Sequence, residues 1–300
     1  NRKFALHGGV STDPAKMQIY VPASATDETE ITGIPAITLA RISSFGGGNL
    51  TLRGDTISLK DPLQNLVATN ECFVTFDVPL HFLASSTFVY RKGADVLKPV
   101  TIDDDVTLGL AGPGGQLIHF YDTVTGPRAT IKDGNGNTSY VHLHVPINVR
   151  YLQCGEWNNF SFTLYASGNQ WQTNSIGYWS RIEGRAVNAF PTNMVMIHRA
   201  YYAGNTTAGD YYLFDCDQTI DRLVSDPPVV SGTAYSQHFV KGSADAVLTL
   251  RGTQDATTYA QLEGAFALVW DPVGDYTQRL VDRTHTISGP LYVKSGTLSV

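Results

Sequence analysis

YVHLHVPINVRY, residues 140–151, alternates between apolar and polar side chains over its whole length. One face of the stretch carries Val141, Leu143, Val145, Ile147, Val149 and Tyr151. The other face carries His142, His144, Pro146, Asn148 and Arg150. A period of two residues is that of a β-strand, whose successive side chains point to opposite faces of a sheet. The stretch therefore predicts one long central strand with a buried apolar face and two histidines on its polar face.

Strand-like segments of this kind follow one another along the rest of the chain. We count roughly fourteen to sixteen of them, separated by turn signals. Short helices are expected only at residues 61–68, 217–224 and 255–263, where Asp217 and Asp255 suit the N-cap position. Many short strands with turns between them are typical of sandwiches and barrels. The sequence thus predicts an all-β fold of antiparallel, jelly-roll-type β-sandwich architecture with long loops.

Two domain organisations fit this pattern. The first is one enlarged β-sandwich over residues 1–300, and the second is a pair of β-sandwich domains, 1–155 and 156–300. We find no convincing internal repeat that would decide between them.

Composition excludes several classes of protein. Hydrophobic residues make up 42% and charged residues 16% of the 300 residues, which indicates a folded chain. The net charge of −6 argues against a basic nucleic-acid-binding surface, although a basic arm before Asn1 would change that balance. Three cysteines without a CxxC pair indicate a reducing compartment. No apolar run approaches the roughly 18 residues of a membrane helix, so we expect no membrane insertion.

His142 and His144 are the first candidate metal ligands, because two imidazoles on one strand face can share an ion. Their spacing, Gly136-x5-His142-x-His144-x3-Asn148-x6-Gly155, resembles the first motif of the cupins, in which two His and a Glu bind metal. Asn148 stands where that family has the glutamate, and the second cupin motif is absent from the sequence. The alternative is a polar sheet face, and we expect no metal and no other cofactor.

Asp103 and Asp105 are further candidate ligands. The run Asp103-Asp104-Asp105 offers carboxylate oxygens to calcium, for example at a subunit contact, and a solvated loop is the alternative. No catalytic motif is recognisable, and we expect the protein not to be an enzyme.

Aromatic residues in the central loops are candidates for an interface, because aromatic side chains anchor many protein contacts. A small core beneath those loops is the alternative. The interface candidates are Trp171, Trp179, Tyr201 and Tyr202, with Arg150 from the polar strand face.

Two further features carry a resemblance to a known family. The segment LEGAFALVWDP, residues 262–272, resembles the apolar strand ending in Asp-Pro of several virus coats, and Asn1-Arg2-Lys3 resembles the visible end of a basic arm. With the all-β pattern, the chain resembles the jelly-roll coat protein of a small icosahedral virus. That resemblance implies a virion structural subunit that assembles with many copies of itself. It also implies viral nucleic acid bound through a basic arm, a possible host receptor, and assembly in the host cytoplasm or nucleus.

Two other functions stay open from the sequence. One is a receptor- or carbohydrate-binding β-protein such as a phage tail or fibre module, with the aromatic loops as its surface. The other is a cupin-like metalloenzyme that uses His142 and His144. Particle size, glycan binding and metal content separate the three hypotheses.

Overall fold

The chain folds into two compact units, residues 1–151 and 152–300. The computed structural model describes residues 2–5, 18–23, 28–39, 41–46, 48–60, 66–69, 72–112, 114–134, 139–154, 160–176, 180–199, 209–227, 230–231, 234–235, 237–281 and 284–300. Among these residues both units consist of β-strands and turns without a helix. Whether each unit is an independent domain stays a prediction.

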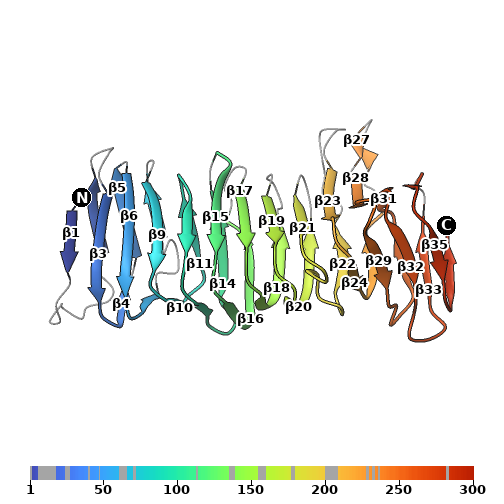
Figure 1. Cartoon of the computed structure of the whole chain (residues 1–300), viewed down its shortest axis with the longest axis horizontal. Helices are drawn as coiled ribbons and strands as arrows, with labels where there is room; N and C mark the ends of the chain where they lie inside the picture. Colours follow the sequence, from blue (N-terminus) through green and yellow to red (C-terminus); the bar gives the residue numbers. More distant parts are fainter. Residues whose placement is uncertain are drawn as a thin grey trace. The chain divides into compact units, whose positions relative to one another are not determined.

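Unit 1 is a parallel β-solenoid whose coils each contribute a strand to three stacks (Figure 1). The first stack contains β1 (Arg2–Ala5), β3 (Glu28–Ile34), β6 (Gly48–Gly54), β9 (Cys72–Asp77), β12 (Ala94–Val96), β15 (Gln116–Phe120) and β17 (Ser139–Leu143). The second contains β4 (Ile37–Leu39), β7 (Ile57–Leu59), β10 (Leu80–Phe82), β13 (Val100–Ile102) and the start of β16 (Val124–Asp133). The third contains β2 (Gln18–Ala23), β5 (Arg41–Gly46), β8 (Leu66–Thr69), β11 (Ser86–Tyr90), β14 (Thr107–Ala111) and the end of β16. The unit boundary falls inside β18 (Ile147–Cys154).

Unit 2 repeats this arrangement. Its first stack contains β19 (Phe160–Leu164), β21 (Arg181–Gly184), β23 (Gly209–Phe214), β28 (Gln237–Gly242), β31 (Gln261–Gly264) and β34 (Thr286–Ile287). The second contains β24 (Gln218–Ile220), β29 (Val247–Leu250), β32 (Ala267–Trp270) and β35 (Leu291–Val293). Further strands are β20 (Gln170–Ile176), β22 (Val195–His198) and β25 (Arg222–Ser225), then β30 (Ala256–Thr258), β33 (Thr277–Leu280) and β36 (Thr297–Ser299). β26 (Val230–Ser231) and β27 (Ala234–Tyr235) form a short antiparallel hairpin.

The prediction of an antiparallel jelly-roll sandwich is therefore wrong, although its all-β part is confirmed. Apart from that hairpin, the described strand pairs with a resolved register are parallel. Contacts between neighbouring coils join residues a few tens of positions apart, for example 22 positions in the pair His81–Asp103 and 24 in the pair Arg128–Asp104. The alternation of side chains is the same in both architectures, because it depends on the strand and not on the direction of its partner.

The expected helices are strands or lie outside the described residues. Residues 217–224 form β24 and most of β25, and residues 255–263 form β30 and most of β31. Of the first expected helix, 61–65 lie outside the described residues and the remainder belongs to β8. Asp217 accepts a hydrogen bond from the backbone N–H of Val247 in the next coil, and Asp255 accepts one from Thr277 in the same way. Neither residue caps a helix.

Columns of stacked, inward-facing side chains form the interior of unit 1. The inward residues of successive first-stack strands lie directly above one another in register. They are at most 2% exposed, and they are Leu52, Phe76, Val96, Phe120 and Leu143. Burial of one such side chain stabilises the fold by about 1.5–3 kcal/mol. The strands therefore hold their register because a slip by one residue would turn this column outward.

The opening stretch, residues 140–151, is two strands and not one. β17 ends at Leu143, the chain turns through 144–146, and β18 begins at Ile147. Pro146 is exposed at this corner, where its missing N–H removes no ladder hydrogen bond. Val141 and Val149 are buried as expected, whereas Val145 in the turn is half-buried.

The segment 262–272 also divides at a corner. β31 ends at Gly264, which has φ +118°, and β32 begins at Ala267. The apolar run that resembled a viral-coat strand thus belongs to two strands of different stacks.

Candidate functional site

An outward column of polar side chains crosses the first stack of unit 1, next to the apolar interior column. In-register pairs connect its members from coil to coil. The members are Thr51, Thr75, Asp95, His119 and His142. Because parallel pairing places equivalent residues of neighbouring strands about 4.8 Å apart, His119 has Asp95 and His142 as its immediate neighbours on this face.

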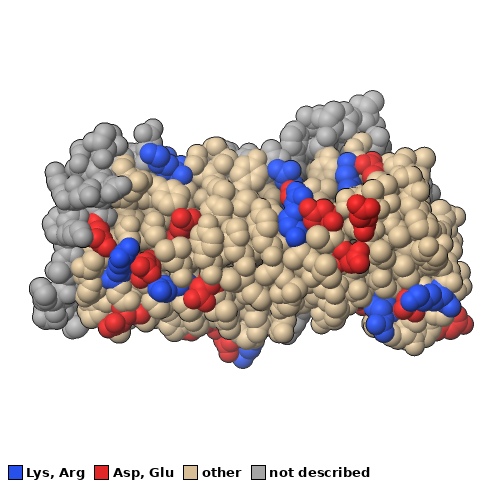
Figure 2. All heavy atoms as spheres, viewed as in Figure 1, with Lys and Arg blue, Asp and Glu red and all other residues tan. Residues whose placement is uncertain are grey.

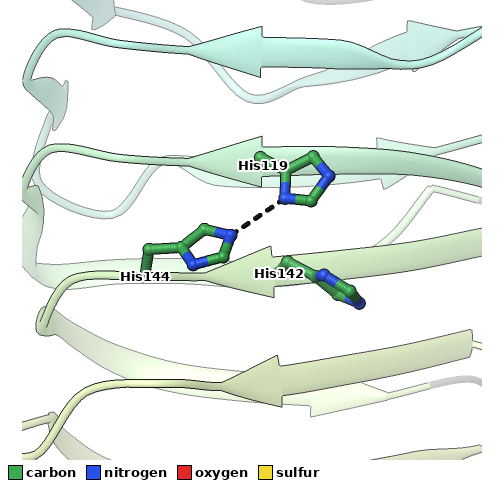
Figure 3. A group of neighbouring side chains, drawn as sticks. All are labelled: His119, His142 and His144. Atoms are coloured by element: carbon green, nitrogen blue, oxygen red, sulfur yellow. Dashed lines mark hydrogen bonds between the residues drawn. The ribbon is translucent and has the colours of Figure 1, made fainter.

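His144 joins this column from the turn that follows β17. Its Nε2 lies 2.9 Å from Nδ1 of His119 in a hydrogen bond between the two rings (Figure 3). One donor nitrogen from each of His119, His142 and His144 lies within 4.8 Å of the others, and all three side chains are half-buried. We call these residues the three-histidine group.

Ring contacts fix the orientation of the group. The His119 and His142 rings meet edge to face at 5.0 Å between centroids, whereas His119 and His144 stack at 5.2 Å. Tyr121, 44% exposed, stacks on His144 at 4.6 Å with an angle of 7° between the rings. Figure 3 shows His119 on β15 and His142 on β17, with His144 just beyond the end of that strand.

Electrostatics favour the neutral, metal-binding form of two of these histidines. Partial burial lowers the pKa of His119, and the nearby Asp95 carboxylate only partly opposes this effect. Partial burial, reinforced by His119, lowers the pKa of His144 as well, again against Asp95. Neutral imidazole is the form that binds a metal ion, because the metal takes the lone pair that a proton would occupy.

The group is close to the dimensions of a tetrahedral site. Metal–nitrogen bonds of 2.0–2.1 Å imply donor separations of about 3.3 Å. The donors here lie within 4.8 Å, so rotations of half-buried side chains can close the difference without movement of the strands. Three imidazoles supply three positions of a tetrahedron and leave the fourth to another donor.

The alternating stretch 140–151 predicted two of the three histidines as ligands, His142 and His144, but not His119. His119 pairs in register with His142 one coil later, so a search for residues one coil apart would have found it. Asn148, at the position of the cupin glutamate, lies on β18 beyond the corner and is not a member of the group.

The other candidate ligands contact basic side chains. Asp103 lies 2.6 Å from His81, and Arg128 contacts Asp105 at 2.9 Å. Arg150, an interface candidate, lies 3.7 Å from Asp105 and is exposed. Among the described residues, Asp103 and Asp105 do not join a group of potential metal ligands.

The aromatic interface candidates divide into two sets. Trp171 is 3% exposed and belongs to the interior of unit 2, so its indole offers no contact surface. Trp179, Tyr201 and Tyr202 lie outside the described residues.

A polar groove in unit 2 bears on the carbohydrate-binding hypothesis. The groove is lined by Thr192, Asn193, Thr219, Asp221, Arg222, Arg251, Thr253, Gln254 and Val273. Its lining contains no aromatic side chain on which a sugar ring could stack, and Arg222 is paired with Asp221. The groove therefore adds no specific support to carbohydrate binding.

The charged side chains lie intermixed on the face shown in Figure 2. Lys and Arg side chains lie beside Asp and Glu side chains there, without a continuous basic surface over the described residues. In the part of the chain that the structure describes, no helix is long and apolar enough to cross a membrane.

Comparison with protein-family models, with curated proteins and with solved structures found no match for this chain.

Proposed function

We propose that this protein is a β-solenoid scaffold that binds one transition-metal ion on the outer face of unit 1. The observation that carries the proposal is the three-histidine group, whose donor nitrogens lie within 4.8 Å of one another on a rigid parallel sheet. His119, His142 and His144 would be its ligands, and Asp95 would favour the approach of a cation.

The donor set selects the class of metal. Imidazole nitrogen suits Zn²⁺, Ni²⁺ and Cu²⁺, whereas Mg²⁺ and Ca²⁺ prefer oxygen ligands. With no carboxylate among the three ligands, a hard cation gains little from this group. Zn²⁺ is therefore the probe of choice and Mg²⁺ its matched control.

The proposed role is binding and not catalysis. The group lies on the outer face of a sheet, where water reaches it, and catalysis benefits from exclusion of water. The open metal position would accept an imidazole or carboxylate from a second molecule. Tyr121, 44% exposed beside the group, would contribute an aromatic contact surface.

The coat-protein role stays a prediction. It was inferred from a jelly roll, and the parallel β-solenoid replaces that fold. Assembly into a particle of many copies would still be recognised by its size in solution.

Replacement of His142 by Ala should weaken metal binding at the three-histidine group. Loss of one of three ligands should weaken Zn²⁺ binding by at least about tenfold, because even outer-shell changes weaken metal sites that much. The measurement is calorimetric titration of the EDTA-treated full chain with Zn²⁺ and, separately, with Mg²⁺. The matched control is His81→Ala, which removes a half-buried histidine from β10 of the same unit.

The outcomes are distinct. Tenfold weaker binding in His142→Ala, with unchanged binding in His81→Ala, supports the proposal. Equal affinity in the parent and in His142→Ala would show that the three-histidine group is not the site. Equal binding of Mg²⁺ and Zn²⁺ would contradict the assignment to imidazole donors.

Acid should release this metal only at comparatively low pH. Since the pKa values of His119 and His144 lie below the usual histidine pKa of about 6.5, both rings take up a proton at lower pH than an ordinary histidine does. Zn²⁺ affinity should be level between about pH 8 and 7 and fall steeply in more acidic buffer, where protons compete for the nitrogens. Calorimetric titrations at stepped pH test this. A steep fall already between pH 8 and 7 would contradict lowered pKa values.

A further inference from the structure

A second group of potential metal ligands lies inside unit 2. His198 belongs to β22, Asp210 to β23 and His238 to β28. Their side chains are 0%, 3% and 1% exposed. Asp210 and His238 are in-register neighbours of the first stack, and His198 reaches them from a strand outside it. Polar residues thus occupy inward positions that elsewhere hold apolar side chains.

The three side chains contact one another directly. Nδ1 of His198 lies 3.0 Å from Oδ2 of Asp210, and Nδ1 of His238 lies 2.7 Å from Oδ1. One donor atom from each residue lies within 4.8 Å of the others, and the two imidazole rings are 5.1 Å apart. Two imidazoles and one carboxylate are a ligand set that recurs for divalent transition metals.

The protein alone leaves this group electrostatically incomplete. Both carboxylate oxygens of Asp210 are held by imidazoles, Oδ2 by Nδ1 of His198 and Oδ1 by Nδ1 of His238, and the side chain is 3% exposed. No described Lys or Arg forms an ion pair with Asp210. A carboxylate taken out of water is costly, and such groups in proteins are paired or bind a metal.

The imidazoles point to the same conclusion. Nε2 of His198 and Nε2 of His238 are buried without a hydrogen-bond partner among the described residues. A buried polar atom without a partner is uncommon in folded proteins and calls for a ligand, ion or other explanation. The buried carboxylate of Asp210 and the unpartnered imidazole nitrogens both indicate that the group lacks a component.

We propose that His198, Asp210 and His238 bind one divalent transition-metal ion as a structural site in the interior of unit 2. One ring nitrogen from each histidine and a carboxylate oxygen of Asp210 would be the ligands. The ion neutralises the buried carboxylate and links β22 to the first-stack strands β23 and β28. Because all three side chains are buried, this ion exchanges slowly and differs in that respect from an ion on the half-buried three-histidine group of unit 1.

The test counts metal that resists a chelator. The parent chain and His142→Ala are dialysed against EDTA without denaturant, and bound metal is measured by mass spectrometry. About one equivalent per chain should remain in both proteins, since His142 belongs to the outer group. Asp210→Asn and His238→Gln, which keep the side-chain volume nearly constant, should lose that equivalent. The matched control is His285→Gln, which removes another unit 2 histidine with a buried, unpartnered Nε2 and should retain the metal.

A second measurement keeps the proposal testable if the variants do not fold. The parent and His142→Ala are unfolded in denaturant with EDTA present, refolded with Co²⁺ and dialysed against EDTA again. The site is supported if bound Co²⁺ is retained and its visible absorption is that of mixed nitrogen and oxygen coordination. A chain that holds no chelator-resistant metal and shows no such absorption overturns the proposal. Metal retained in both Asp210→Asn and His238→Gln also overturns it, because the ion would then lie elsewhere.

Discussion

Replacement of Phe120 by Ala should lower the free energy of unfolding by about 3–5 kcal/mol. Phe120 is 2% exposed and stacks in register between Val96 and Leu143 in the interior column of unit 1. Removal of the ring forfeits its burial and leaves a cavity that the regular ladder on either side cannot close. Urea unfolding, followed by circular dichroism, measures the loss.

The matched control is His119→Ala on the same strand. Its side chain lies on the outer face and is half-buried, so its removal should cost less than about 1 kcal/mol, the value of a typical hydrogen bond. Equal losses from the two substitutions would mean that β15 does not present Phe120 inward and His119 outward.

Replacement of Gly264 by Ala should lower the free energy of unfolding nearly as much, because of its backbone conformation and close backbone contact. Gly264 has φ +118°, and a Cβ atom added there would lie 2.1 Å from the carbonyl oxygen of Gly242 in the neighbouring coil. Unfavourable backbone angles alone cost about 1–3 kcal/mol, and relief of the overlap requires movement of β28 against β31. We expect a loss above about 3 kcal/mol in the same urea experiment.

Gly114→Ala separates the two contributions. Gly114 also has a positive φ, +83°, but a Cβ atom there would have no other atom within 4 Å. This variant should lose only the conformational part, about 1–2 kcal/mol. A Gly264→Ala protein as stable as Gly114→Ala would show that strands β28 and β31 are not in the close contact described.

The strand pattern was predictable from sequence, and its pairing was not. Alternation around Val141 and Val149 correctly identified buried positions, because it reports the two faces of a strand. The direction of the partner strand leaves no trace in that alternation. The relevant signal was the spacing of strands by one coil, which is hidden because stacked positions such as Thr75, Asp95 and His119 share an orientation and not a residue type.

The candidate site was half predictable for the same reason. His142 and His144 are neighbours in sequence, whereas His119 reaches them only through parallel pairing of β15 with β17. The interior group of unit 2 gave no local signal at all. His198, Asp210 and His238 are separated by 12 and 28 residues, and only the coiling of the chain brings them together.

Stacking of each coil on its immediate neighbours makes stability within a unit a nearly one-dimensional quantity. In such a protein the free energy is close to a sum of terms for single coils and for adjacent pairs of coils. A substitution in β15 should accordingly be felt by β12 and β17 and fade with each further coil. A metal ion that links strands would then stabilise mainly the coils that it contacts. Its removal should change the coil at which unfolding begins before it prevents the chain from folding.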